Sequence, residues 1–185
     1  MYLIVGLGNP EEDYSNTRHN MGFETVNKLA EEYNIKINKN KFKALYGTGI
    51  IEGEKVVLLK PQTYMNLSGE SIKEAIDFYK IEKEELIIVY DDIDIEPGII
   101  KIRKTGGPGT HNGMKSVMQN VTTKDFTRIR IGIGKPQYKS DLINYVLGFI
   151  PKEEKEILDK STAKGKDAIV EIIKNGVDIA MNKYN

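Results

Sequence analysis

The feature that most constrains this chain is an apolar run, Leu86 to Tyr90, that leads directly into an acidic segment. A strand without polar residues must be covered on both faces, which is typical of the centre of a sheet packed between helices. A second apolar run, Tyr2 to Leu7, is followed by Gly8 and Pro10, so it also predicts a short buried strand. Both runs indicate an α/β fold.

The other patterns alternate between strand and helix. Strands are predicted over about residues 43–51, 55–60, 98–104 and 126–133. Helices are predicted over about 19–33, from Ser68 as a candidate N-cap, over 112–120 and over 152–174. Asn175-Gly176 has the composition of a C-cap and precedes a short last helix. Together these patterns predict one α/β domain, residues 1–185, with a mixed, twisted central sheet flanked by helices.

Composition limits the classes of function. The chain has 27 basic and 27 acidic residues, so a nucleic-acid partner needs a local basic cluster rather than overall attraction. No cysteine is present, which excludes disulfides and thiolate metal sites and is compatible with a reducing cytoplasm. No stretch approaches the roughly 18 apolar residues of a membrane span, so we expect no membrane association.

Only two histidines are present, and each is followed by asparagine: His19-Asn20 and His111-Asn112. Imidazole is the side chain best suited to accept a proton near neutral pH, so general-base chemistry is expected at one of these two. His19 has polar neighbours, and a carboxylate such as Asp91 could fix its tautomer. A purely structural histidine remains the alternative.

The acidic segment Asp91 to Glu96 permits two further interpretations. Four carboxylates at a strand end could bind Mg²⁺, which predicts a metal-dependent nuclease or phosphohydrolase. The segment could also be a solvated turn closed by Pro97-Gly98. No calcium-loop pattern is present, and the incomplete glycine fingerprint Gly6-x-Gly8 lacks its third glycine, so no nucleotide cofactor is expected.

Other polar residues follow predicted strands. Asn66 could supply an amide at the sheet edge beside an apolar wall of Tyr64 and Met65, although turn and cap chemistry would explain the segment equally well. On the strands Ile100–Arg103 and Arg128–Ile131, cations alternate with isoleucines. Such a pattern indicates either a sheet with one solvent-exposed face or a basic surface that binds a phosphate backbone.

Six motifs together carry a family resemblance. They are Gly6-Leu7-Gly8-Asn9-Pro10, Thr17-Arg18-His19-Asn20-Met21-Gly22, Tyr64-Met65-Asn66-Leu67-Ser68-Gly69, Asp91-Asp92-Ile93-Asp94-Ile95-Glu96-Pro97-Gly98, His111-Asn112-Gly113 and Arg128-Ile129-Arg130-Ile131-Gly132-Ile133-Gly134. In order and spacing they resemble the bacterial peptidyl-tRNA hydrolases across essentially the whole chain. Each motif alone is weak, but six in register are highly specific.

The resemblance implies roles for individual residues. His19 matches the catalytic base, Asp91 the carboxylate that orients it, and Asn9 the residue that separates N-blocked from free aminoacyl-tRNA. Substrate or tRNA contacts are expected at Tyr14, Tyr64, Met65, Asn66, His111, Asn112, Lys101, Arg103 and Arg130.

The implied activity is hydrolysis of the ester between a peptide, or an N-blocked amino acid, and tRNA, which recycles tRNA from stalled translation. The resemblance further implies a cytoplasmic monomer without metal or cofactor. No residue resembles a covalent nucleophile, which favours direct attack by water. The alternatives are the Mg²⁺-dependent nuclease and an RNA-binding module without catalysis.

Overall fold

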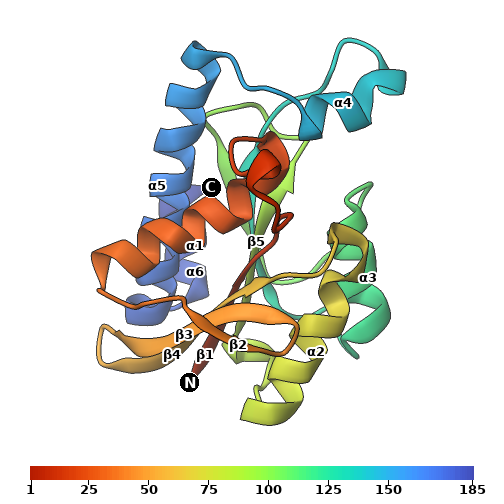
Figure 1. Ribbon diagram of the computed structural model, residues 1–185. Helices are drawn as coiled ribbons and strands as arrows, with labels where there is room; N and C mark the ends of the chain where they lie inside the picture. Colours follow the sequence, from red (N-terminus) through yellow and green to blue (C-terminus); the bar gives the residue numbers. More distant parts are fainter.

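The computed structural model describes residues 1–185 as helices packed on both faces of one seven-stranded sheet (Figure 1). The strands are β1 (Tyr2–Gly6), β2 (Lys39–Lys41), β3 (Ala44–Ile51), β4 (Glu54–Pro61), β5 (Leu86–Asp92), β6 (Ile100–Arg103) and β7 (Thr127–Gly132). The helices are α1 (Met21–Glu32), α2 (Ser68–Tyr79), α3 (Asn112–Asn120), α4 (Leu142–Leu147), α5 (Lys152–Asn175) and α6 (Val177–Tyr184). The predicted α/β class and mixed sheet are confirmed.

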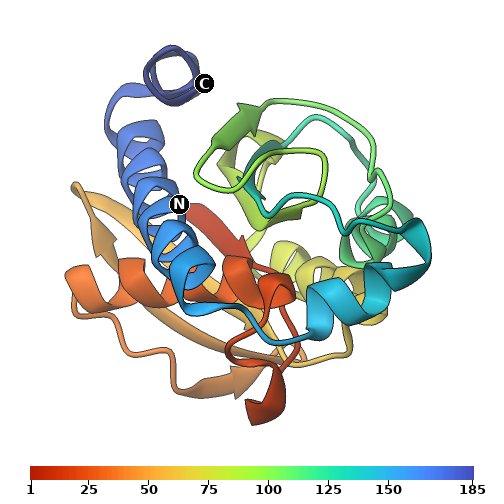
Figure 2. The ribbon, with the colours of Figure 1, turned by 90° about the horizontal axis from the view of Figure 1, so that it is seen from above.

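The strand order is β2-β3-β4-β1-β5-β7-β6. β4, β1, β5 and β7 run parallel, and antiparallel strands complete both sides. The two apolar runs of the sequence are the adjacent central strands β1 and β5. Alternation of side chains sends Ile4 to one core, under α1, α5 and α6, and Leu3 and Val5 to the other core, under α2 and α3 (Figures 1 and 2).

This topology creates a crevice at the carboxyl ends of β1 and β5. The chain leaves β1 towards α1 on one face of the sheet, whereas the chain beyond β5 continues, after β6, to α3 on the other face (Figure 2). Connections that depart to opposite faces leave a gap at the strand ends, where open α/β sheets place their sites. Asn9 follows β1 and Asp91 is the penultimate residue of β5, so both are at this gap.

Some local predictions differ from the structure. Ser68 is not an N-cap: its hydroxyl donates a hydrogen bond to the Met65 carbonyl at 2.8 Å, because a short 3₁₀ turn, Met65–Leu67, leads directly into α2. The predicted helix over 19–33 begins as a separate 3₁₀ turn, Arg18–Asn20, before α1. Gly176, with φ of 96°, ends α5 as the sequence predicts. The patterns did not predict β2 or α4.

Gly22, in the first turn of α1, permits the approach of this helix to the sheet. A Cβ at this position would overlap the carbonyl oxygens of Val89, within β5, and of Leu7, just after β1. Because His19 lies three residues before Gly22, the close approach of the helix also sets the distance between the imidazole and the end of β5.

We expect Gly22→Ala to lower the free energy of unfolding by about 2 kcal/mol or more, because the methyl group must push α1 off the sheet. Urea denaturation measures the change. Gly107→Ala is the control, since a Cβ there meets nothing within 4 Å. Equal urea midpoints for the two variants would contradict this account of the helix position.

Candidate active site

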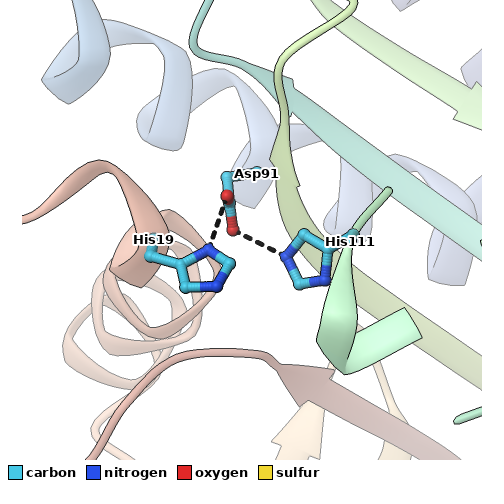
Figure 3. Close-up of side chains that lie close together, drawn as sticks. All are labelled: His19, Asp91 and His111. Carbon is cyan, nitrogen blue, oxygen red and sulfur yellow. Dashed lines mark hydrogen bonds and ion pairs between the residues drawn. The ribbon is translucent and has the colours of Figure 1, made fainter. Parts of the chain in front are cut away.

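The centre of the site is the carboxylate of Asp91, whose side chain is 1% exposed. Its Oδ2 lies 2.8 Å from Nδ1 of His19, and its Oδ1 lies 2.9 Å from Nε2 of His111 (Figure 3). The two imidazole rings lie side by side, with centroids 4.9 Å apart. Three segments distant in sequence therefore meet at the end of β5.

The tautomer of His111 follows from its position as N-cap of α3. Its Nδ1 accepts a hydrogen bond from the backbone N–H of Met114 at 3.2 Å, so this nitrogen carries a lone pair. The ring proton must then be on Nε2, which donates it to Asp91. Both nitrogens of His111 are thus occupied, and the ring is neutral. His111 cannot serve as the base in this arrangement.

His19 has the opposite arrangement. Its Nδ1–H donates to Asp91, which leaves the lone pair on Nε2 without a protein partner. The His19 side chain is only 12% exposed. Burial alone would lower the pKa of His19, but the charge and hydrogen bond of Asp91 outweigh burial and raise the pKa above its ordinary value. The pKa of Asp91 would rise through its complete burial, yet the two imidazoles hold it well below its usual range.

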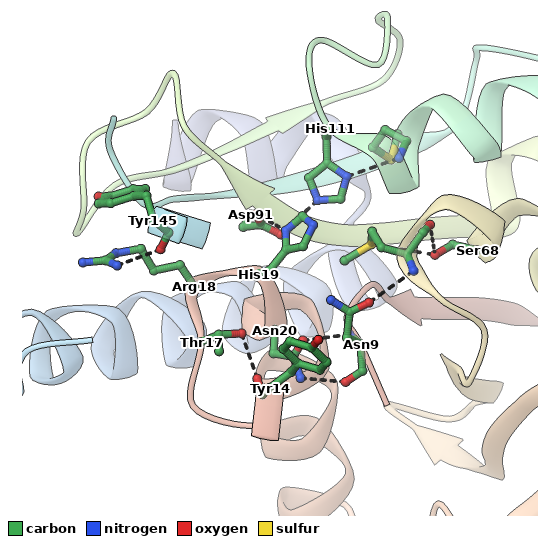
Figure 4. A network of polar contacts seen from close by, with 12 residues as sticks. Asn9, Tyr14, Thr17, Arg18, His19, Asn20, Ser68, Asp91, His111 and Tyr145 are labelled. Carbon is green, nitrogen blue, oxygen red and sulfur yellow. Dashed lines mark hydrogen bonds and ion pairs between the residues drawn. The ribbon is translucent and has the colours of Figure 1, made fainter. Parts of the chain in front are cut away.

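Asn9 is held so that its amide N–H₂ stays free. Its backbone N–H donates to Oδ1 of Asn20 at 2.8 Å, and Nδ2 of Asn20 donates to the Asn9 carbonyl at 3.0 Å. The N–H of Met65 donates to Oδ1 of Asn9 at 3.2 Å, which directs the Asn9 Nδ2 towards the side where His19 lies (Figure 4). The amide can therefore donate to an oxygen placed beside His19. Asn20, as the clamp of Asn9, was not identified from the sequence.

A cleft of about 150 Å³ opens beside the imidazoles. Of the predicted residues, those that line it are His19, Asp91, His111, Asn112 and Arg130. Three apolar residues of α4 form one wall: Leu142, Ile143 and Val146. The sequence patterns gave no sign of this wall, because α4 is short and has no buried residue.

The remaining predicted contacts lie outside this cleft. Met65 is buried, whereas Tyr64 and Asn66 are exposed, and Tyr14 is half-buried in the 3₁₀ turn Glu12–Tyr14. The Tyr64 hydroxyl lies 3.4 Å from Glu11, which joins this segment to the loop after β1. These four predicted residues, together with Asn9, form a second rim of the site.

The basic residues of β6 and β7 share one face, with Lys101 opposite Arg130 and Arg103 opposite Arg128. Arg128 is 1% exposed and donates to the Gly106 and Lys124 carbonyls. Arg128 is therefore structural, and the hypothesis of four gripping cations is reduced to three. Arg130 pairs with Asp92 at 3.1 Å, Lys101 is half-buried, and Arg103 is exposed.

In the acidic segment after β5, which one interpretation makes a magnesium site, Asp92 and Asp94 are paired with other groups of the protein. Asp92 accepts from the Asp94 backbone N–H and pairs with Arg130, and Asp94 pairs with Lys135 at 2.9 Å. The group whose ligand atoms do converge is His19, Asp91 and His111. The proton on Nε2 of His111 occupies the atom that would have to bind a metal, so this geometry opposes metal binding.

A carboxylate-oriented imidazole with a free nitrogen, in a cleft at the switch point of an α/β sheet, is an arrangement suited to a hydrolytic enzyme that uses a general base. The peptidyl-tRNA hydrolase family model matches residues 3–185. The chain is 52% identical over 185 residues to the peptidyl-tRNA hydrolase of Clostridium botulinum strain Eklund 17B, covering 100% of this chain and 96% of that protein. It is 51% identical to that of Clostridium perfringens strain SM101, covering 100% and 97%.

Solved structures agree with the sequence relatives. The crystal structure of peptidyl-tRNA hydrolase from Acinetobacter baumannii superposes with a TM-score of 0.94 at 41% identity, covering 100% of this chain and 94% of that one. The chain belongs to the peptidyl-tRNA hydrolase family.

We expect an NMR titration to give His19 a pKa above about 6.5 in the wild type. In Asp91→Asn the pKa should fall below about 6.5, because burial remains while the negative charge is lost. Nitrogen chemical shifts should show His111 protonated on Nε2 alone. The His19 signal is assigned by its absence in His19→Ala. A His19 pKa that does not move in Asp91→Asn would contradict the proposed electrostatics.

Proposed function

We propose that this chain hydrolyses the ester bond between the peptide, or an N-blocked amino acid, and the terminal ribose of tRNA. The observation that carries the proposal is the free Nε2 of His19, oriented by a buried carboxylate at the edge of a cleft. Family membership supports the substrate.

In the proposed reaction, Nε2 of His19 removes a proton from water while the water oxygen attacks the ester carbonyl. Asp91 stabilises the imidazolium that forms, without itself accepting the proton. The Asn9 Nδ2 donates to the developing oxyanion, a contribution typically worth about 10²–10³-fold. Collapse of the tetrahedral intermediate then breaks the bond between the carbonyl carbon and the ribose oxygen. The ribose oxygen takes the imidazolium proton, and the peptide leaves as the carboxylic acid.

Attack by water is favoured over a covalent intermediate. No serine or threonine hydroxyl hydrogen-bonds to either histidine, and Ser68 donates instead to a backbone carbonyl. Because the base must be deprotonated, kcat/KM should increase with pH through the raised pKa of His19 and then level off.

The remaining expectations are part of the same proposal. Lys101, Arg103 and Arg130 contact tRNA phosphates, and Tyr14, Tyr64, Met65, Asn66, His111 and Asn112 bind or frame the acceptor end and the ester. The enzyme works as a cytoplasmic monomer without a metal. None of its helices has the length and apolar character needed to cross a bilayer. The Mg²⁺-dependent nuclease is not favoured, because the carboxylates it needs are paired elsewhere.

We expect His19→Ala to reduce peptide release from N-acetyl-aminoacyl-tRNA by about 10²–10⁴-fold, because the general base is lost. Binding of tRNA, measured by filter retention, should stay within about twofold of wild type. The wild type should keep its full rate in EDTA and cut only the ester. Products cleaved at phosphodiester bonds, or activity that needs added Mg²⁺, would overturn the proposal in favour of the nuclease.

We expect Arg130→Ala to raise the KM for N-acetyl-aminoacyl-tRNA about tenfold and to reduce the salt slope of binding by about one. A minimal substrate, an N-blocked aminoacyl nucleoside, should lose much less. Lys55→Ala removes the same charge from the exposed start of β4, which β1 and β5 separate from β7, and serves as the control. Equal losses on both substrates would contradict the phosphate contact.

A further inference from the structure

Arg18, the residue before His19, is 6% exposed, and all three nitrogens of its guanidinium donate hydrogen bonds. Nε and Nη2 donate to the two carboxylate oxygens of Glu154, in the first turn of α5, at 2.9 and 2.8 Å. Nη1 donates to the backbone carbonyl of Tyr145 in α4 at 2.9 Å, and the guanidinium lies 3.9 Å from the centre of the Tyr145 ring (Figure 4). Such a planar, bidentate and stacked arrangement is specific to arginine.

Arg18 is one of the residues that hold helix α4 in place, through Tyr145. None of its six residues is fully buried, and only Tyr145 and Val146 pack against the core beneath it. Two hydrogen bonds at Tyr145 hold the helix. Arg18 donates to the Tyr145 carbonyl, and the Tyr145 hydroxyl donates to the Ile133 carbonyl just beyond β7. The same helix supplies the apolar wall of the cleft through Leu142, Ile143 and Val146.

We propose that Arg18 is a positioning residue that holds the α4 wall at a fixed place relative to the base, through Tyr145 and Glu154. One residue thus connects His19, its neighbour in the chain, to the opposite wall of the cleft. His19 keeps its own hydrogen bond to Asp91, so release of Arg18 loosens the wall without removing the base. This inference rests on the proposed function only in taking the cleft as the substrate site.

The competing interpretation is that Arg18 merely attaches α5 to the rest of the fold. Loss of such an attachment would lower the folded fraction, and therefore the apparent kcat, but would leave the KM of the folded molecules unchanged. Loss of a positioned wall acts instead on substrate binding, because misplacement of a contact surface weakens the complex. The separation of KM from kcat distinguishes the two.

The test uses the full chain with Glu154→Ala and Arg18→Lys, the second of which keeps the charge but not the fork. Asp159→Ala is the matched control. Like Glu154, Asp159 is a carboxylate of α5 in an ion pair, but its partner is Lys28 of α1, at 2.6 Å. Steady-state hydrolysis of N-acetyl-aminoacyl-tRNA gives KM and kcat, and hydrogen exchange of residues 138–149 reports α4 independently of activity.

Both Arg18→Lys and Glu154→Ala should raise KM by about tenfold or more, with kcat within about twofold and the acid limb of the pH profile unmoved. Exchange in α4 should become faster in Glu154→Ala and stay at the wild-type rate in Asp159→Ala. A wild-type KM in both variants, or unchanged α4 exchange, overturns the proposal. If the wild type itself fails to hydrolyse the substrate, the proposed function falls, while the exchange comparison still decides the role of Arg18.

Discussion

A single buried carboxylate receives a hydrogen bond from each histidine of the chain, and this shared acceptor sets the protonation of both rings. Asp91 is buried, and the hydrogen bonds from the two imidazoles favour its anionic form. The Met114 N–H fixes the proton of His111 on the nitrogen that faces Asp91. His19 supplies the other donor through Nδ1, which leaves Nε2 as the one imidazole nitrogen able to take a proton.

The sheet topology makes this meeting possible. β1 and β5 are adjacent parallel strands whose onward connections pass to opposite faces, so the turn before α1 and the start of α3 both reach the end of β5. Gly22 lets α1 begin close against the sheet, and the His111 N-cap begins α3 on the far side. The rigid parallel strands place Asp91, and the two helix starts bring the histidines to it.

Asn9 and helix α4, which lie on different sides of the site, are held in place in different ways. Asn9 is fixed by backbone and side-chain hydrogen bonds from Asn20 and Met65, whereas α4 lies over the cleft with no buried residue of its own. The part held by hydrogen bonds therefore lies on the side of His19, and the half-exposed α4 forms another wall of the cleft. Arg18 connects the two, because it directly precedes His19 in the chain while its side chain contacts Tyr145.

The sequence by itself determined the fold class, because apolar runs such as Leu86–Tyr90 can be buried only between helices, and the rarity of histidine confined the base to two positions. It also determined the family, since six motifs in register identify it. The hydrogen-bond partners of His19 and His111, the burial of Arg128, the pairing of Asp92 with Arg130 and the α4 wall were decided only by the tertiary structure. Each depends on hydrogen bonds or contacts between residues far apart in the chain, and local periodicity carries no information about such partners.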